Sequence, residues 1–318
     1  MFNRTAILVF LVTILLTLLC LKFWPMLAHA GNGFDLSKTS IPQEEILPGG
    51  PPRDGIPSID DPKFIPAQQV GGMRAEEQVL SLTIDGRTRA YPISILNWHE
   101  IVNDEIAGKP VVISYCPLCG TGMAFSAEVK GKVLDFGVSG LLYNSDVLLY
   151  DRETESLWSQ LKKEAVSGPQ IGTQLEMLPL VQMTWSEWKR RFPMGEVLSR
   201  DTGYRRNYDM SPYGSYDESP MIYFPVEFLS QAYHPKERVI GVDIDGHYKA
   251  YPFAELARFG GDEVIDQVNG VKLKIRYNTM ARTAEVFDAH SGEVIPAVNG
   301  FWFAWFTFHP KTDVCKSP

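Results

Sequence analysis

The chain has 318 residues, a formal net charge of -8 and 45% apolar residues, a share typical of proteins that bury a core. This length allows one large or two ordinary domains. Because the chain is acidic and has no clusters of lysine and arginine, it lacks the electrostatic footprint of a nucleic-acid-binding protein and of a protein that docks on anionic lipid headgroups.

Residues 1–30 have the pattern of an export signal. Arg4 is the only charge before an apolar run from Ala6 to Leu21, and Ala28-His29-Ala30 follows. A short positive start, an apolar stretch and an A-x-A ending are typical of a secretory signal peptide. With Phe23 to Leu27 included, the run is also long enough for an uncleaved membrane anchor. We therefore expect an extracytoplasmic protein, periplasmic or on the cell surface, that meets the membrane only through this segment.

Residues 31–75 are rich in Pro, Gly and Asp and show no apolar periodicity. This composition predicts a Pro/Gly-rich linker that follows the surface of the body. The body itself is predicted over 76–318.

Two stretches of the body are similar. Residues 78–92 read QVLSLTIDGRTRAYP, and residues 238–252 read RVIGVDIDGHYKAYP. Each predicts an alternating strand, a tight Asp-Gly turn and a second strand that ends at Tyr-Pro. We predict a mainly β (β-rich α+β) fold with a few helices. Two degenerate repeats of a β unit, at 77–160 and 237–312, are joined by a helical and loop insert at 161–236.

The insert has two features of its own. Thr184 followed by Glu187 resembles a capping box, which predicts the start of a helix. The Tyr-, Gly- and Asp-rich stretches 201–209 and 212–216 are typical of ordered loops that cover the surface or line a pocket.

The two repeats differ in their reactive residues. The first contains His99, Cys116 and Cys119, whereas the second has Asn278 and Ala281 where the cysteines would stand. Packing alone does not require this difference, so it indicates a functional site in the first repeat.

The sequence Cys116-Pro-Leu-Cys119-Gly120 follows an apolar strand and allows three interpretations. In thioredoxin-like sites a helix begins at the first cysteine, but here a Gly-Thr-Gly sequence and another strand follow. A metal site fits better, because Gly120 allows a left-handed backbone and both thiolates can reach one ion. The third interpretation is a disulfide that stiffens the turn.

A closed metal site needs more than two thiolates, and His99, His309, Cys315 or an acidic residue could complete it. His99 lies beside Trp98, where a histidine is either a ligand or a hydrogen-bonded core residue. His309 follows the aromatic sequence 301–308, which predicts a mostly buried strand. Glu100 is a candidate proton carrier or an orienting group for His99, or simply a solvated side chain.

The polar sequence Tyr143-Asn-Ser-Asp146 separates two apolar strands. Asn, Ser and Asp are good residues for a hairpin turn. The alternative, which the turn does not exclude, is a polar rim beside the cysteine loop. Tyr143 and Asp146 are therefore candidate catalytic residues together with Glu100.

Several signatures are missing. The sequence has no G-x-S-x-G, no Walker loop, no H-E-x-x-H and no C-x-x-C-H. It therefore gives no support to a serine hydrolase, a nucleotide-binding protein or a haem protein.

Long motifs resemble the signature of the prokaryotic domain-of-unknown-function 3179 family. They are Ala90-Tyr-Pro92, Asn97-Trp-His-Glu-Ile-Val-Asn-Asp104, Ser114-Tyr-Cys-Pro-Leu-Cys-Gly-Thr-Gly122, Phe136-Gly-Val-Ser-Gly-Leu-Leu-Tyr-Asn-Ser-Asp146, Tyr150-Asp-Arg152, Ser156-Leu-Trp-Ser-Gln160 and Asp201-Thr-Gly-Tyr204. The resemblance implies a shared design and shared site residues, among them Cys116, Cys119, His99 and the Tyr143–Asp146 segment. It implies no particular reaction.

The sequence thus predicts an exported protein that binds a transition metal (zinc, copper or iron) through Cys116, Cys119 and His99 or His309. In this hypothesis Glu100 and Asp146 lie around the ligands. Two alternatives stay open. One is a thiol redox protein in which Cys116 attacks and Cys119 resolves, and the other is an interaction module with a structural disulfide.

Overall fold

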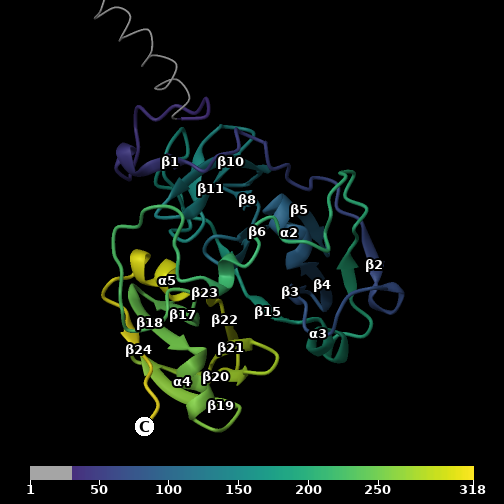
Figure 1. Cartoon of the computed structure of the whole chain (residues 1–318), viewed down its shortest axis with the longest axis vertical. Helices are drawn as coiled ribbons and strands as arrows, with labels where there is room; N and C mark the ends of the chain where they lie inside the picture. Colours follow the sequence, from purple (N-terminus) through teal and green to yellow (C-terminus); the bar gives the residue numbers. More distant parts are fainter. Residues whose placement is uncertain (1–30) are drawn as a thin grey trace, which may run out of the picture.

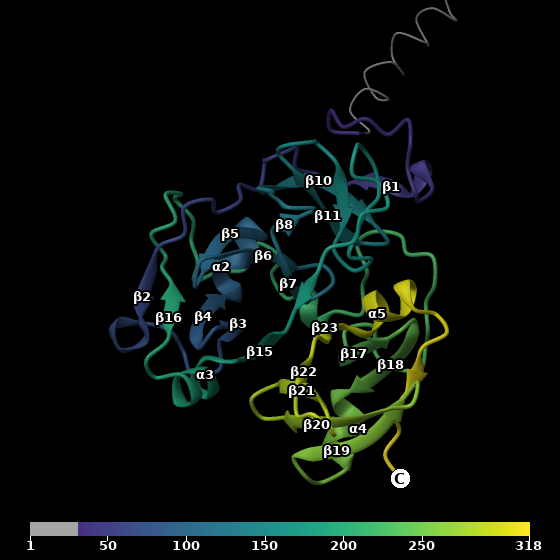
Figure 2. The ribbon, with the colours of Figure 1, turned by 180° about the vertical axis from the view of Figure 1, so that it is seen from behind.

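The computed structural model describes residues 31–318, so the predicted export segment lies outside the described residues. The predicted β-rich fold is confirmed: four short helices accompany several sheets. None of the helices within 31–318 is long and apolar enough to cross a membrane. Figures 1 and 2 show three groups of strands packed around a common middle, with the loops that join them running over its surface.

The largest sheet has eight strands and crosses the middle of the molecule. Its strands in spatial order are β24 (Asp313–Val314), β18 (His247–Pro252), β17 (Arg238–Ile244), β23 (Val298–Phe301), β7 (Thr121–Ser126), β6 (Lys109–Cys116) and β5 (Ile101–Ile106), with β14 (Met177–Leu178) paired to β7. This sheet joins the two predicted repeats, because β23 belongs to the second and β7 to the first.

Three smaller sheets and one hairpin surround the large sheet. The first has the order β15 (Leu180–Thr184), β3 (Gln78–Ile84), β4 (Arg87–Pro92), β16 (Glu196–Leu198), β2 (Phe64–Pro66). The second has the order β1 (Ile46–Pro48), β10 (Phe136–Tyr143), β11 (Asp146–Asp151), β12 (Leu157–Ser159), β13 (Glu164–Ala165). The third has the order β19 (Glu263–Val268), β20 (Val271–Asn278), β21 (Thr283–Asp288), β22 (Val294–Ile295), and the hairpin is β8 (Glu128–Val129) with β9 (Lys132–Val133).

The two similar segments follow the same order of elements. A hairpin, a helix and three antiparallel strands follow one another as β3, β4, α2 (Ile93–His99), β5, β6, β7 and as β17, β18, α4 (Phe253–Arg258), β19, β20, β21. The recurring Tyr-Pro sequence has a structural role in both: the hydroxyl group of Tyr91 donates to Asp104, and that of Tyr251 donates to Asp266. A common origin of the two segments stays a prediction.

The correspondence extends beyond the repeat borders that the sequence suggested. In the first segment β15, α3 (Trp185–Arg191) and β16 follow, and in the second β23, α5 (Trp302–Phe308) and β24 follow. β15 and β23 each pair antiparallel with the first strand of their segment, and β16 and β24 each pair parallel with the second. β14 and β22 also correspond, because each pairs antiparallel with the last of the three strands. What the second segment lacks is the stretch 127–176, which contains β8 to β13.

The predicted linker, 31–75, lies against the body through short strands. β1 pairs with β10, and β2 pairs with β16. Ile59 is buried and bridges to Val102. This segment therefore forms part of the surroundings of the first repeat.

The aromatic sequence 301–308 was predicted as a strand, and this prediction is wrong. β23 ends at Phe301, and the helix α5 continues from Trp302. An apolar run of this length does not distinguish a buried helix from a strand. Tertiary packing decides here: the ring of Trp305 lies 2.2 Å from where a Cβ atom on Gly241 would stand, so β17 has room for the helix only because residue 241 is glycine.

The predicted helix start at Thr184 is confirmed, because its hydroxyl group accepts a hydrogen bond from the backbone N–H of Glu187. Replacing Thr184 by Ala is expected to lower the free energy of unfolding by about 1 kcal/mol, the usual cost of losing an N-cap. Thr184→Ser keeps the hydroxyl group and is the matched control. Urea denaturation of both variants measures the difference, and equal losses would contradict the capping role.

Candidate metal centre

The two cysteines lie in a turn between neighbouring strands. β6 ends at Cys116 and β7 begins at Thr121. As predicted, a strand and not a helix follows, and Gly120 has a left-handed backbone with φ 60°. A Cβ atom at this position would lie 2.8 Å from the ring of Phe301, so both conformation and space require glycine there.

A second turn lies against the first. Asn144 and Ser145 connect β10 to β11 with φ angles of 51° and 65°, the left-handed pair of a two-residue hairpin. The predicted hairpin turn is thus confirmed. The carbonyl oxygen of Ser145 accepts from the thiol of Cys119 at 3.3 Å and, more weakly, from that of Cys116 at 3.8 Å.

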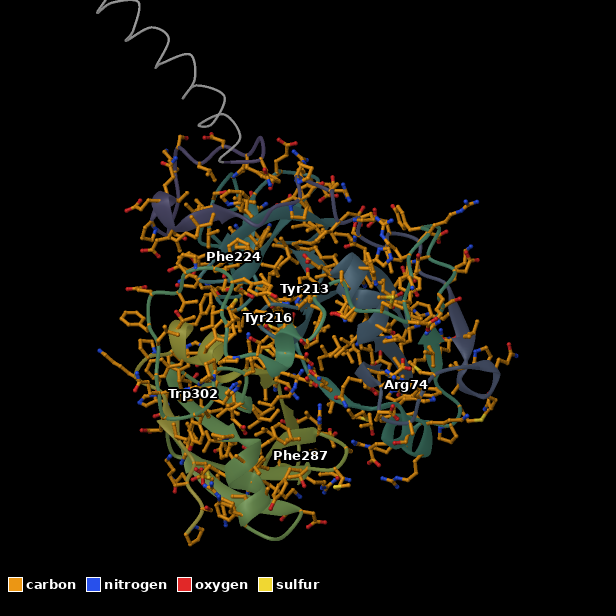
Figure 3. The ribbon with its side chains drawn as sticks, viewed as in Figure 1. Arg74, Tyr213, Tyr216, Phe224, Phe287 and Trp302 are labelled. Carbon is orange, nitrogen blue, oxygen red and sulfur yellow. The ribbon has the colours of Figure 1, made fainter. Side chains whose placement is uncertain are left out.

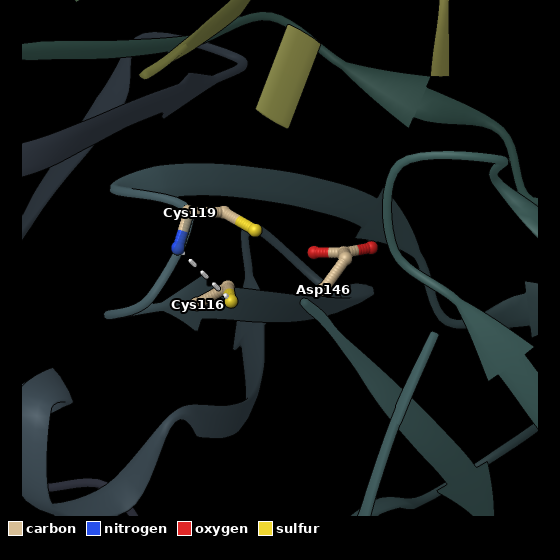
Figure 4. Close-up of side chains that lie close together, drawn as sticks. All are labelled: Cys116, Cys119 and Asp146. Carbon is tan, nitrogen blue, oxygen red and sulfur yellow. Dashed lines mark hydrogen bonds between the residues drawn. The ribbon is translucent and has the colours of Figure 1, made fainter. Parts of the chain in front are cut away.

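The second turn also brings in a carboxyl group, that of Asp146. The ligand atoms of Cys116, Cys119 and Asp146 lie within 4.8 Å of one another, and no other group of three Cys, His, Asp or Glu within 31–318 is as close. Figure 4 shows the Asp146 carboxyl group facing the sulfur atoms. The three residues are 1%, 0% and 0% exposed. Both cysteines are free thiols in the structure.

Burial disfavours negative charge on this cluster. It raises the pKa of Asp146 to about 7 and raises the pKa of the Cys119 thiol well above its usual value. The pKa of Cys116 is raised too, first by burial and then by the neighbouring acids Asp146 and Glu100. Asp146 Oδ2 accepts from the backbone N–H of Leu161 at 3.0 Å, whereas Oδ1 has no hydrogen-bond partner among the described residues. A buried, unpartnered carboxylate oxygen is costly unless a cation or donor meets it.

Two further ionisable side chains, Glu100 and Lys236, lie near the cluster. Glu100 is buried directly after α2, burial raises its pKa to about 7, and it accepts a hydrogen bond of 3.1 Å from the Tyr213 hydroxyl group. Lys236 is 5% exposed, and its ammonium group lies 3.3 Å from the centre of the Tyr216 ring. Burial lowers the pKa of Lys236 to about 8, while the nearby Cys119 raises it.

His99 was predicted as a metal ligand, and the structure does not bring it into the cluster. Its Nδ1 lies 2.8 Å from the carbonyl oxygen of Pro57, and its Nε2 lies 2.7 Å from the hydroxyl group of Tyr208. Since a carbonyl oxygen only accepts, Nδ1 carries the proton and Nε2 accepts from Tyr208. Both nitrogens are therefore occupied, and His99 ties the loop containing Tyr208 to α2. This is the core role that the sequence left as the alternative.

His309 and Tyr143 also lie outside the cluster. The ring of His309 stacks on Tyr248 at 4.0 Å, packs against Trp305 at 4.2 Å and has a pKa lowered to about 4 by burial. The ring of Tyr143 packs against Phe308 at 5.7 Å. The structure thus brings Asp146, which was expected around the ligands, close to the two cysteines, and brings neither His99 nor His309 there.

Sequence reasoning missed Lys236 and the carbonyl group of Ser145. A carbonyl group leaves no trace in a residue type, and Lys236 is an isolated lysine just before β17. The one indication in the sequence was that Ser145 stands next to the candidate residue Asp146. The loop 212–216, which was expected to cover the surface or line a pocket, supplies Tyr213 and Tyr216.

The buried acids predict how the stability of the metal-free protein depends on pH. Because the folded state raises the pKa of Asp146 and Glu100 to about 7, it binds more protons than the unfolded chain between about pH 4 and 7. The contribution of these two acids to stability is therefore fully present below about pH 4 and is lost as pH rises through 7, by about 1.4 kcal/mol per unit of pKa shift. Urea denaturation with chelator at pH 5 and pH 8 measures the fall.

Neutral substitutions test the origin of this pH dependence. Asp146→Asn and Glu100→Gln should each reduce the loss in free energy of unfolding between pH 5 and pH 8. Glu128→Gln, at an exposed position, should leave this loss unchanged. A metal-free protein that gains stability from pH 5 to pH 8 would refute the assignment.

Comparison with known proteins agrees with the resemblance seen in the motifs. A family model described as "Protein of unknown function (DUF3179)" matches residues 53–312, which is most of the chain. Among curated proteins and among solved structures, nothing matches.

Proposed function

We propose that this chain, which belongs to the DUF3179 family of proteins of unknown function, binds one divalent transition-metal ion through Cys116, Cys119 and Asp146. The observation that carries the proposal is the unpartnered Oδ1 atom of Asp146, fully buried and facing two thiols. A bound cation would stabilise the ionised forms of all three groups, which burial alone disfavours.

The donor set favours zinc. Zinc accepts both thiolate sulfur and carboxylate oxygen, whereas monovalent copper prefers sulfur alone and magnesium and calcium prefer oxygen. Two thiolates and one carboxylate carry three negative charges, so a divalent ion leaves one. The ammonium group of Lys236, close enough for Cys119 to raise its pKa, balances that charge. Zinc with three protein ligands keeps a position for water or substrate and supplies Lewis-acid chemistry there.

The thiol redox alternative has less support. The nucleophile in thiol exchange is the thiolate, and both thiols have raised pKa values because they are buried beside acidic groups. No helix N-terminus points at Cys116, because β7 follows the turn. Two cations of the kind that lower thiol pKa values in redox proteins, Lys236 and Arg238, do lie near the turn, but burial outweighs them and the pKa of both thiols stays raised.

Metal analysis of the full chain tests the proposal. Protein purified without chelator should contain about one zinc ion per chain, or take one up from solution. Cobalt in place of zinc should give the intense absorption of a cobalt–thiolate bond. Metal-free protein that takes up neither ion, and whose two thiols cycle under mild reductant, would instead support the redox function.

Export is part of the same proposal and rests on residues 1–30 alone. Their sequence supports a signal peptide or an anchor, and the body would then meet its metal outside the cytoplasm. Fractionation of cells should find the chain outside the cytoplasm, and the mass of its N-terminus separates cleavage after Ala30 from retention as an anchor. A cytoplasmic, full-length chain would contradict export.

A further inference from the structure

A cavity of about 540 Å³ lies beside the metal centre. Five segments form its walls: residues 49–56, the end of α2, the hairpin β10–β11, the loop 206–224 and Leu118 of the cysteine turn. Residues 49–56, the hairpin β10–β11 and the loop 206–224 belong to none of the elements that the two similar halves share. The parts of the chain that make the first half different therefore meet around this cavity.

The wall of the cavity is mostly apolar, with one polar end. Ile56, Val138, Leu142 and Phe224 contribute apolar side chains from different segments, and buried Glu100 with Tyr213 forms the polar end. Half-buried Asn97 and exposed Arg206 also line the cavity. Tyr213 and Phe224 both lie in the middle region of the molecule in Figure 3. Among the described residues, Glu100 receives one side-chain hydrogen bond, from Tyr213, whereas a carboxyl group can make several.

Two residues of the wall connect the cavity to the metal centre. Leu118 stands between the two cysteines, and Val147 follows Asp146 directly; both line the cavity. The carboxyl group of Glu100 also raises the pKa of Cys116, so it is electrostatically close to the thiols.

We propose that this cavity binds a small, uncharged, mostly apolar molecule whose one polar group hydrogen-bonds to Glu100. Its size lies in the range of small-molecule sites, which are typically apolar with a few polar groups that fix orientation. A charged ligand would lose its hydration among apolar side chains, and an anion would also approach buried Glu100. Arg206 lines the cavity as well, but it is exposed and therefore hydrated. The binding site stands on the cavity alone, whereas the identification of its ligand as the substrate of the metal centre rests on the proposed function.

Calorimetric titration with 2-naphthol tests the proposal, because this probe is uncharged, apolar and has one hydroxyl group. Wild-type protein should bind one molecule per chain, and the anion 2-naphthoate should bind at least tenfold more weakly. Ile56→Trp, which fills the cavity from a half-buried position, should weaken 2-naphthol binding at least tenfold. The matched control Ile295→Trp, also half-buried but on β22, should stay within twofold of wild type.

A second pair of variants tests the polar end. Glu100→Leu should lower the preference for 2-naphthol over naphthalene by about fivefold, the loss of one hydrogen bond, and Glu100→Gln should retain most of it. No saturable binding to the wild type, equal binding to Ile56→Trp, or an unchanged preference in Glu100→Leu would each overturn the proposal.

Repeating the titration with Asp146→Asn separates this inference from the proposed function. If the metal proposal fails but the cavity binds, 2-naphthol should bind wild type and Asp146→Asn alike, and neither should hold zinc. If the cavity proposal fails but the metal binds, wild type should hold zinc and show no 2-naphthol binding.

Discussion

Replacing Cys116 or Cys119 by serine is expected to abolish stoichiometric zinc binding. Each substitution removes one of two thiolates from a set in which only one other group, Asp146, lies close enough to contribute. Loss of an outer hydrogen-bonding partner already costs about 10- to 100-fold in metal affinity, so the loss of a direct ligand should cost more than about 100-fold. Competition against a chromophoric chelator measures the change.

Cys315 provides the matched control. It is also a buried free thiol, but it packs in a different apolar cluster with residues of β17 to β21. Cys315→Ser should bind zinc like the wild type. If all three serine variants lose zinc alike, or if Cys116→Ser keeps it, the assignment of the metal to this turn is wrong.

The largest effect on stability is expected from Trp158→Ala, with a loss of about 3–5 kcal/mol in the free energy of unfolding. Trp158 is completely buried on β12, where its ring packs edge-on against Phe136 at 5.9 Å. Its ring N–H also donates to the buried carboxyl group of Asp151 at 2.9 Å. The substitution therefore leaves a cavity and removes one of the hydrogen bonds to a buried acid, which keeps two from Thr154.

Two companion variants divide this loss into its parts. Trp158→Phe keeps an aromatic ring but loses the donor, and should cost about 1–3 kcal/mol. Trp98→Ala removes a half-buried ring and should cost clearly less than Trp158→Ala. Thermal and urea denaturation of the three variants at one pH measures the order of their stabilities. A Trp158→Ala protein as stable as Trp98→Ala would contradict the packing described here.

Local patterns predicted the hairpins and the cysteine turn because their determinants lie in adjacent residues. Asp85-Gly86 forms the turn between β3 and β4 with two positive φ angles, and Gly120 takes the left-handed backbone that its place after Cys119 suggested. The segment 301–308 was predicted wrongly because its conformation depends on Gly241, sixty residues earlier in the sequence.

The cluster of Cys116, Cys119 and Asp146 was predicted in part for the same physical reason. The pair Cys116 and Cys119 is local and was recognised from spacing alone. The position of the Asp146 carboxyl group depends on how β10 and β11 pack against the cysteine turn, and this packing cannot be predicted from local residue types. His99 was favoured as a ligand because it occurs only in the first repeat, but its hydrogen bonds to Pro57 and Tyr208 were invisible in the sequence.

The second half of the chain lacks the cysteines, yet it holds the turn that contains them. The backbone N–H of Phe301 donates to the carbonyl oxygen of Cys119 at 2.9 Å, and Arg238 donates to that of Gly120 at 3.1 Å. These contacts come from residues made late in translation. The turn has the geometry described here only when the second half has folded against it, so the proposed metal would load after residues 238 and 301 are in place.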